Sequence, residues 1–96
     1  MTTYKLSVLS PDGEIFNGDV ISLLLRGADG DICILAGHIP LITTVKPGRC
    51  VITLPDEEEI EGELKAGILD VGKDNVKLIV GNDGAFADLT PGGRNE

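Results

Sequence analysis

The sequence predicts an all-β domain, an antiparallel β-sandwich or flattened barrel of about eight to ten short strands. Three observations support this fold class. Short apolar or alternating runs recur along the chain, the thirteen glycines and five prolines are spread over its whole length, and no window shows sustained helical periodicity. A chain of 96 residues forms one domain with one core. Because aromatic residues make up only 3% of the chain, that core must be aliphatic.

The first two strands are predicted on either side of a tight turn. Apolar and polar residues alternate over residues 4–8, and Ser10-Pro11-Asp12-Gly13 suits a type I turn. The returning strand runs from Glu14 to Leu25. Asn17-Gly18 interrupts this strand, which indicates a bulge or a bend within it.

The stretch from residue 27 to residue 42 predicts a rigid β corner. Asp29-Gly30 is a turn signal, because glycine accepts a positive φ and the aspartate side chain can bond its own backbone. Residues 32–35 form a short apolar run, which is typical of a strand buried on both faces. Gly37 lets the chain turn a corner, and Pro40 makes Ile39 extended before the next apolar run.

The middle of the chain predicts a strand over residues 41–45, a type II turn at Lys46-Pro47-Gly48 and an alternating strand over residues 50–54. An acidic segment follows, with six carboxylates between Asp56 and Glu63. It lacks the ligand spacing and central glycine of a calcium loop. We therefore interpret it as a solvated hairpin tip and an exposed strand.

The last strands are predicted over residues 66–71 and 76–80, followed by a weak segment over residues 85–89. We expect a sandwich domain over residues 1–89 and a flexible tail over residues 90–96. The core is expected to include the inward members of these strands: Leu6, Val8, Leu23, Leu25, Ile34, Leu41, Ile52, Ile68, Val76, Leu78 and Val80.

Charge and composition exclude several classes of partner. The net charge is −8, and residues 56–96 carry most of it, so nucleic acid and anionic lipid are poor partners. No apolar run is long enough to span a membrane and no signal peptide is visible, so we expect a soluble, cytoplasmic and monomeric domain. Cys33 and Cys50 lie in apolar runs and are expected to be buried free thiols.

The sequence offers little for catalysis or for cofactor binding. His38 is the only histidine, and two cysteines with one histidine are too few for a zinc site. No loop matches a phosphate-binding motif, so neither a metal nor a cofactor is expected. A Cys33–His38 pair in a small hydrolase is a weak alternative, because their odd spacing places them on opposite faces of one strand. His38 either bonds nearby backbone at a strand corner or contacts a partner protein.

Several motifs together resemble one family, the epsilon subunit of the rotary F-type ATP synthase, over its N-terminal β-sandwich domain. The match runs from about residue 4 to residue 80 and has two departures, Cys33 in place of a usual glycine and Lys65-Ala66-Gly67 in place of a glycine pair. The motifs are Pro11-Asp12-Gly13, Phe16-x-Gly18, Gly27-x-x-Gly30-Asp31, Ile34-Leu35-x-Gly37-His38-x-Pro40-Leu41 and Pro47-Gly48.

The resemblance implies a non-catalytic rotor subunit at the cytoplasmic face of the bacterial membrane. It would bind the gamma subunit, rest on the c ring and help to couple proton transport to ATP synthesis. By the same resemblance we expect a gamma contact at His38, Ile42 and Thr43 and a c-ring contact at Asp29, Gly30 and Asp31. The alternative is a stand-alone β-sandwich that binds another protein.

The family usually continues into a two-helix hairpin that can bind ATP or restrain its hydrolysis. Here the residues after Leu89 include a proline and two adjacent glycines. Proline costs about 3 kcal/mol and glycine about 1 kcal/mol in a helix relative to alanine. We therefore expect that this polypeptide assembles and couples but neither binds ATP nor inhibits its hydrolysis by helix extension.

Overall fold

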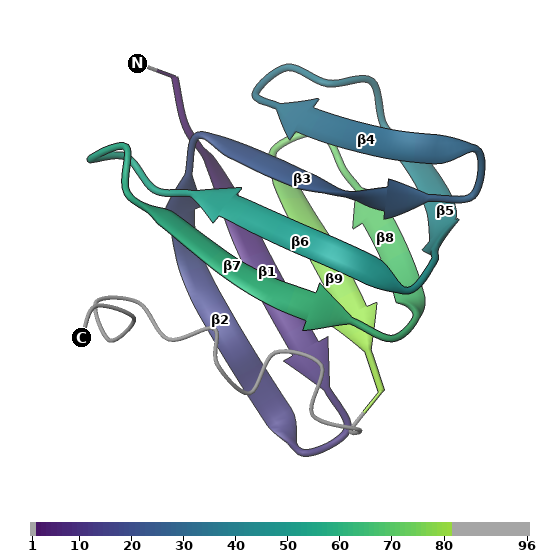
Figure 1. Cartoon of the computed structure of the whole chain (residues 1–96). Helices are drawn as coiled ribbons and strands as arrows, with labels where there is room; N and C mark the ends of the chain where they lie inside the picture. The colour runs from purple at the N-terminus through teal and green to yellow at the C-terminus, as the bar shows by residue number, and fades with distance from the viewer. Residues whose placement is uncertain (1, 82–96) are drawn as a thin grey trace.

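The computed structural model describes residues 2–81, which form nine strands arranged in two packed layers (Figure 1). The weak segment over residues 85–89 and the expected tail lie outside the described residues. None of the described residues belongs to a helix long and apolar enough to cross a membrane. The strands are β1 (Tyr4–Ser10), β2 (Gly13–Val20), β3 (Ser22–Gly27), β4 (Gly30–Leu35), β5 (Leu41–Val45), β6 (Gly48–Thr53), β7 (Glu59–Leu64), β8 (Gly67–Val71) and β9 (Asn75–Val80).

The two layers belong to one sheet that folds over on itself. One layer has the strand order β2-β1-β9-β8-β5, and the other, in front of it in Figure 1, has the order β4-β3-β6-β7. A single residue pair, Gly27 of β3 with Val45 of β5, joins them. The all-β sandwich predicted from the sequence is confirmed.

One strand pairing departs from the antiparallel prediction. Seven of the eight pairings are antiparallel, whereas β1 and β9 are parallel. Leu6 lies beside Val76, and Val8 lies beside Leu78, so the inward residues of both strands stay in register. The chain can make this parallel pair because the whole front layer lies between β1 and β9 in sequence.

The expected interruption at Asn17-Gly18 is wrong. Both residues stay paired with β1, and the chain instead leaves the strand at Ile21, whose N–H donates to the Thr53 carbonyl at 2.7 Å. The buried residues explain the position of the break. Val20 and Leu23 both face the core although three positions separate them, so a single alternating strand cannot contain both.

The prediction that residues 32–35 are buried on both faces is also wrong. Ile34 is fully buried, but Cys33 is exposed and Leu35 is 53% exposed. β4 lies at the edge of the front layer, where β3 is its paired strand, and no strand of the described residues covers its outer side. An uninterrupted apolar run therefore does not show which of its residues face inward.

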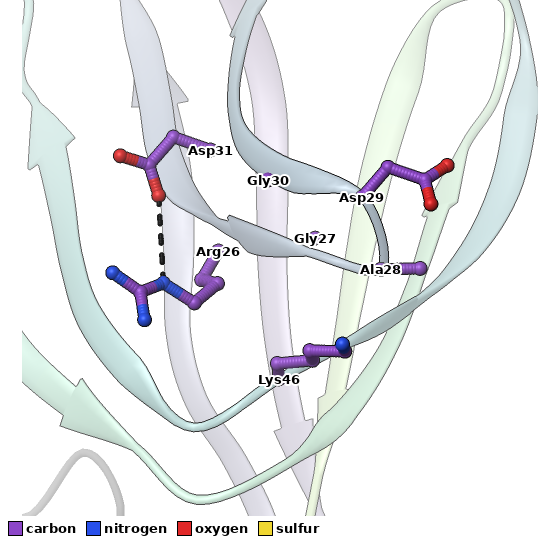
Figure 2. A pocket seen from close by; sticks show the side chains of 7 residues that line it. All are labelled: Arg26, Gly27, Ala28, Asp29, Gly30, Asp31 and Lys46. Atoms are coloured by element: carbon purple, nitrogen blue, oxygen red, sulfur yellow. Dashed lines mark ion pairs between the residues drawn. The ribbon is translucent and has the colours of Figure 1, made fainter.

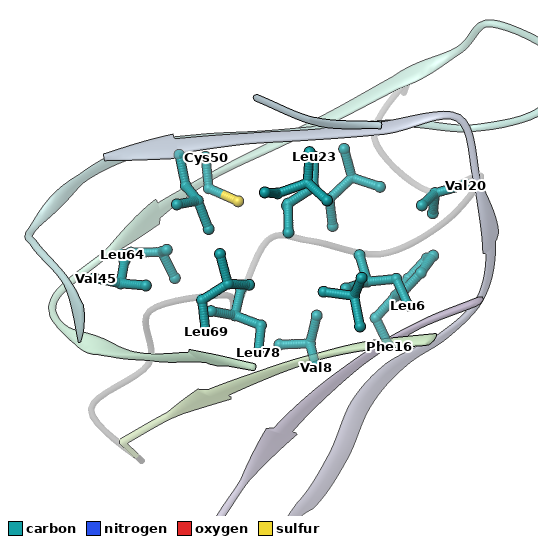
Figure 3. Packing of buried hydrophobic residues seen from close by; sticks show 14 of the residues in the cluster. Leu6, Val8, Phe16, Val20, Leu23, Val45, Cys50, Leu64, Leu69 and Leu78 are labelled. Carbon is teal, nitrogen blue, oxygen red and sulfur yellow. The ribbon is translucent and has the colours of Figure 1, made fainter. Parts of the chain in front are cut away.

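Aliphatic side chains from both layers fill the space between them (Figure 3). Nine of the eleven predicted core residues are buried, whereas Leu41 is only partly buried and Ile68 is 47% exposed. Ile68 points outward because Leu69 and Val71 are the inward residues of β8. The cluster also contains Cys50, whose burial is predicted separately, and residues that the prediction missed: Tyr4, Phe16, Val20, Val45, Ile60, Leu64, Leu69 and Val71.

The acidic segment adopts the solvated hairpin that the sequence predicts. All six of its carboxylate residues are exposed, and β7 is the edge strand of the front layer. The tip is a tight turn in which the Glu58 N–H donates to Asp56 Oδ1 at 3.0 Å and Glu57 has a φ of 71°. Charges along an edge strand also discourage pairing with other chains.

The two cysteines differ, although both are free thiols. Cys50 is buried as predicted, but the prediction that Cys33 is buried is wrong. Burial raises the pKa of Cys50 from 9.0 to about 12. The folded chain therefore holds this proton more tightly than the unfolded chain. The resulting stabilisation is complete below about pH 9 and is lost as the pH rises toward 12.

Adjacent leucines on β3 test the assignment of the core. Leu25 is 1% exposed and Leu24 is 38% exposed on the outer side of the same strand. Leu25→Ala should lower the free energy of unfolding by about 2–5 kcal/mol, because it removes methyl groups from a filled core. Leu24→Ala should cost about 1 kcal/mol or less. Urea denaturation measures both values, and equal losses would contradict the inward orientation of Leu25.

Thiol labelling tests the two cysteine environments. At pH 8 the folded chain should react quickly with one equivalent of an aromatic disulfide reagent, at Cys33. Cys50 should react only after unfolding, because the thiol is buried and its raised pKa keeps it protonated. Cys33→Ser supplies the control, since this variant should show no fast reaction. Two fast thiols in the folded wild type would contradict the burial of Cys50.

Candidate functional site

The β3–β4 turn brings Asp29, Gly30 and Asp31 together at one end of the sandwich, as the sequence predicts. Gly27 pairs with Gly30, which leaves a two-residue loop, and Gly30 has a φ of 136° that disfavours any other residue. All three predicted residues are exposed. The two carboxylates point in different directions from the turn (Figure 2).

Two cations beside this turn were missed in the sequence. Arg26 Nε lies 3.6 Å from Asp31 Oδ1, and the backbone N–H of Lys46 donates to the Arg26 carbonyl at 2.9 Å. We call Arg26, Asp29, Asp31 and Lys46 the charged corner; they line an open hollow of about 550 Å³ (Figure 2). Both partners of the ion pair are mostly exposed, so the pair itself adds little stability. The corner thus presents two positive and two negative groups to solvent.

His38 occupies a separate corner between β4 and β5. Gly37, with a φ of 85°, turns the chain there, and the His38 N–H donates to the Leu35 carbonyl at 3.1 Å. The imidazole Nδ1 lies 2.8 Å from the Ile39 carbonyl oxygen. Since a carbonyl oxygen only accepts, Nδ1 carries the proton in this contact and Nε2 is left as an acceptor in the neutral ring. His38 is half-buried, so the ring is accessible.

Ile42 and Thr43 lie on opposite faces of β5. Ile42 points outward and is 73% exposed, whereas Thr43 is half-buried on the side that contains Val45. The Thr43 hydroxyl donates to the Thr44 carbonyl at 3.4 Å. The structure therefore brings His38 and Ile42 to the surface and directs Thr43 toward the interior side.

A row of outward residues crosses the back layer beside Ile42. Thr44 is paired with Ile68, Ile68 with Ile79, and Ile79 with Leu9. Ile68 is 47% exposed and Ile79 is 43% exposed. We call Ile42, Thr44, Ile68 and Ile79 the outer apolar face. Sequence reasoning identified Ile42 but missed the other members, because β5, β8 and β9 must be placed in register before the row exists.

The geometry does not favour the alternative of a thiol hydrolase. Cys33 lies on the outer side of β4, and the Nδ1 atom of His38 is engaged with the Ile39 carbonyl. A nucleophilic thiol needs a base within hydrogen-bond reach. The described residues thus offer two kinds of surface, one charged and one apolar, and both suit contact with another macromolecule.

Comparisons with known proteins indicate one family. The family model described as "ATP synthase, Delta/Epsilon chain, beta-sandwich domain" matches residues 3–82. A protein named ATP synthase epsilon chain from Persephonella marina is 40% identical over 77 residues, which cover 80% of this chain and 57% of the relative. The protein of the same name from a Sulfurihydrogenibium species is also 40% identical, with 58% of its length covered.

Solved structures show the same fold at lower identity. A chain in the Euglena gracilis mitochondrial ATP synthase structure, which contains OSCP, F1 and the c ring, aligns with a TM-score of 0.77 at 18% identity. That alignment covers 83% of this chain and 51% of the other. A chain of the Tetrahymena thermophila mitochondrial ATP synthase central stalk and c ring aligns with a TM-score of 0.70 at 15% identity, over 81% and 63% of the two chains. The present chain thus spans less than two thirds of the relatives it matches.

Proposed function

This chain belongs to the ATP synthase delta/epsilon chain family, and from that membership we propose that it is a non-catalytic subunit of the central stalk. In this role it links the gamma subunit to the c ring and helps to couple proton transport to ATP synthesis. It then resides at the cytoplasmic face of a bacterial membrane as part of the complex. The observation that carries the proposal is the family match over residues 3–82, which includes both candidate surfaces.

The outer apolar face supports a large protein partner. Isolated exposed apolar residues are ordinary, but here Ile68 and Ile79 are paired on neighbouring strands, and Thr44 of β5 continues the row. Such a group is the kind of patch that marks an interface. Ile42 is the most exposed member at 73%. We assign the gamma contact to this face together with His38. Thr43 would contribute to the contact only through its backbone, since its side chain turns inward.

The charged corner suits a polar surface such as the loops of the c ring. Asp29, Gly30 and Asp31 form its tip, and Arg26 and Lys46 add positive charge beside them. Exposed charges of both signs set alignment and association rate more than they set affinity. The proposed contact therefore aligns this subunit with the c ring without needing a large apolar area.

The packing of the domain also fits a part that must transmit torque. Leu6, Leu23, Ile52 and Leu78 are fully buried between the layers, and close-packed interiors deform little under load. A stand-alone protein-binding sandwich remains the second candidate, because the outer apolar face would serve it equally well. Copurification with the membrane-bound ATP synthase distinguishes the two functions. The boundaries proposed for the domain, residues 1–89, extend beyond the described residues.

Substitutions on the outer apolar face and at the His38 corner test the gamma contact. Ile42→Asp and His38→Glu each place a carboxylate in the proposed interface, and each should weaken binding to the gamma subunit by roughly thirtyfold, or about 2 kcal/mol. Leu24→Asp is the matched control, because Leu24 is an exposed apolar residue on the opposite side of the sandwich. Calorimetric titration with purified gamma subunit gives the affinities. Equal binding by all three variants would refute the assignment.

Charge reversal tests the proposed c-ring contact. Asp31→Lys removes the partner of Arg26 and makes the charged corner strongly positive, so it should loosen the coupling of proton flow to ATP synthesis. The effect should grow at low ionic strength, because salt screens exposed charges. Vesicles reconstituted with the whole complex supply the measurement, and Asp56→Lys at the distant acidic hairpin is the control. Unchanged coupling with Asp31→Lys would leave the turn as an ordinary solvated loop.

A further inference from the structure

Tyr4 makes a buried hydrogen bond from one layer of the sandwich to the other. Its hydroxyl donates to the Ile34 carbonyl oxygen at 2.8 Å, although the two residues are 30 positions apart. Tyr4 lies on β1 in the back layer and is 9% exposed; Ile34 lies on β4 in the front layer and is fully buried. A tyrosine buried in an aliphatic core needs a partner for its hydroxyl, and here the partner is strand backbone.

β4 has few other attachments. It pairs with β3 along one side, and no second strand pairs with its other side among the described residues. Its edge position is visible in Figure 1. An edge strand opens locally more easily than a central one, because fewer contacts must break. Strand pairing holds β4 only along the side that faces β3. The hydroxyl of Tyr4 therefore adds a second attachment, at Ile34.

The segment just after this bond leads into the His38 corner. Leu35, Ala36 and Gly37 connect Ile34 to His38, and Tyr4 and His38 line the same small hollow of about 20 Å³ beside the β8–β9 turn. This volume is close to that of a single water molecule, so Tyr4, Ile34 and His38 lie close together around the hollow. The position of His38 thus depends on the position of Ile34.

We propose that Tyr4 is a positioning residue, whose hydroxyl holds the end of β4 and the following segment, residues 35–39, in the conformation that presents His38 to the gamma subunit. The identity of the partner, the gamma subunit, rests on the proposed function. The effect of Tyr4 on residues 35–39 does not. Burial raises the pKa of Tyr4 above its ordinary value of 10.0, so the hydroxyl remains a donor throughout the physiological range. Tyr4→Phe keeps the ring in the core and removes only the donor.

The first measurement needs no partner. In the full chain, Tyr4→Phe should speed hydrogen exchange at the backbone amides of residues 35–39 by about three- to tenfold, the change expected for loss of one hydrogen bond. Exchange in β8 and β9 should change only as much as global stability does. The control is Phe16→Leu, which perturbs the core beneath β2, away from β4. Equal acceleration at all amides, or none at residues 35–39, would overturn the proposal.

The second measurement uses purified gamma subunit. Tyr4→Phe should weaken its binding by about three- to tenfold, beyond any effect of Phe16→Leu at a matched loss of stability. Equal binding by the two variants would show that Tyr4 contributes stability alone and would overturn its positioning role. Failure of the wild type to bind gamma subunit would count against the proposed function instead, and local exchange at residues 35–39 would still decide the role of Tyr4.

Discussion

The junction between β3 and β5 is the constraint on which the architecture depends. Only Gly27 and Val45 pair there, and the neighbouring hydrogen bond from Lys46 to Arg26 completes the contact. A Cβ atom at Gly27 would clash with the side chain of Ile32, so any other residue at this point would require Ile32 to move. With so narrow a connection the sheet can fold over and cover its own apolar side. The same fold brings the β3–β4 turn against the β5–β6 turn, which creates the charged corner.

The interior and the exterior of this domain differ in chemical character. Among the described residues the buried core cluster is aliphatic apart from Tyr4, Phe16 and Cys50, and it contains no charged residue. The chemically varied side chains lie outside, on the charged corner, on the acidic β6–β7 hairpin and at the His38 corner. Tyr4 is the exception, since it is a polar group within the core that reaches across the layers. The described part of the chain therefore presents its charged and polar groups mainly on its surface.

The sequence predicts the fold well because alternation reveals which side chains are buried. In β1 the polar residues Lys5 and Ser7 alternate with the apolar ones, and the inward positions of Leu6 and Val8 are predicted correctly. Alternation fails where it is absent or broken. Residues 32–35 are all apolar, so nothing in that run distinguishes Ile34 from its exposed neighbours. In β8, Ile68 and Leu69 are equally apolar, and Leu69 is the one that pairs with the buried Leu78 and shares the inward side with Val71.

The candidate site was predictable to the extent that it is local. Asp29-Gly30 is a turn signal in any protein, and the turn forms where expected. Arg26 and Lys46 are twenty residues apart in sequence and come together only through the Gly27–Val45 junction, so no local pattern could connect them. The outer apolar face has the same origin, because Thr44, Ile68 and Ile79 form a row only after three strands are placed in register.

The parallel pairing of β1 with β9 also determines when the domain can fold during synthesis. A nascent chain that has emerged as far as β7 contains every strand of the front layer, but its back layer consists of the β1–β2 hairpin and β5 without the two strands that lie between them. The apolar side of the front layer then has no complete cover, and β1 has an open edge. Such non-local pairings form slowly, and exposed edges favour aggregation. The back layer can therefore be completed only after β9 has left the ribosome.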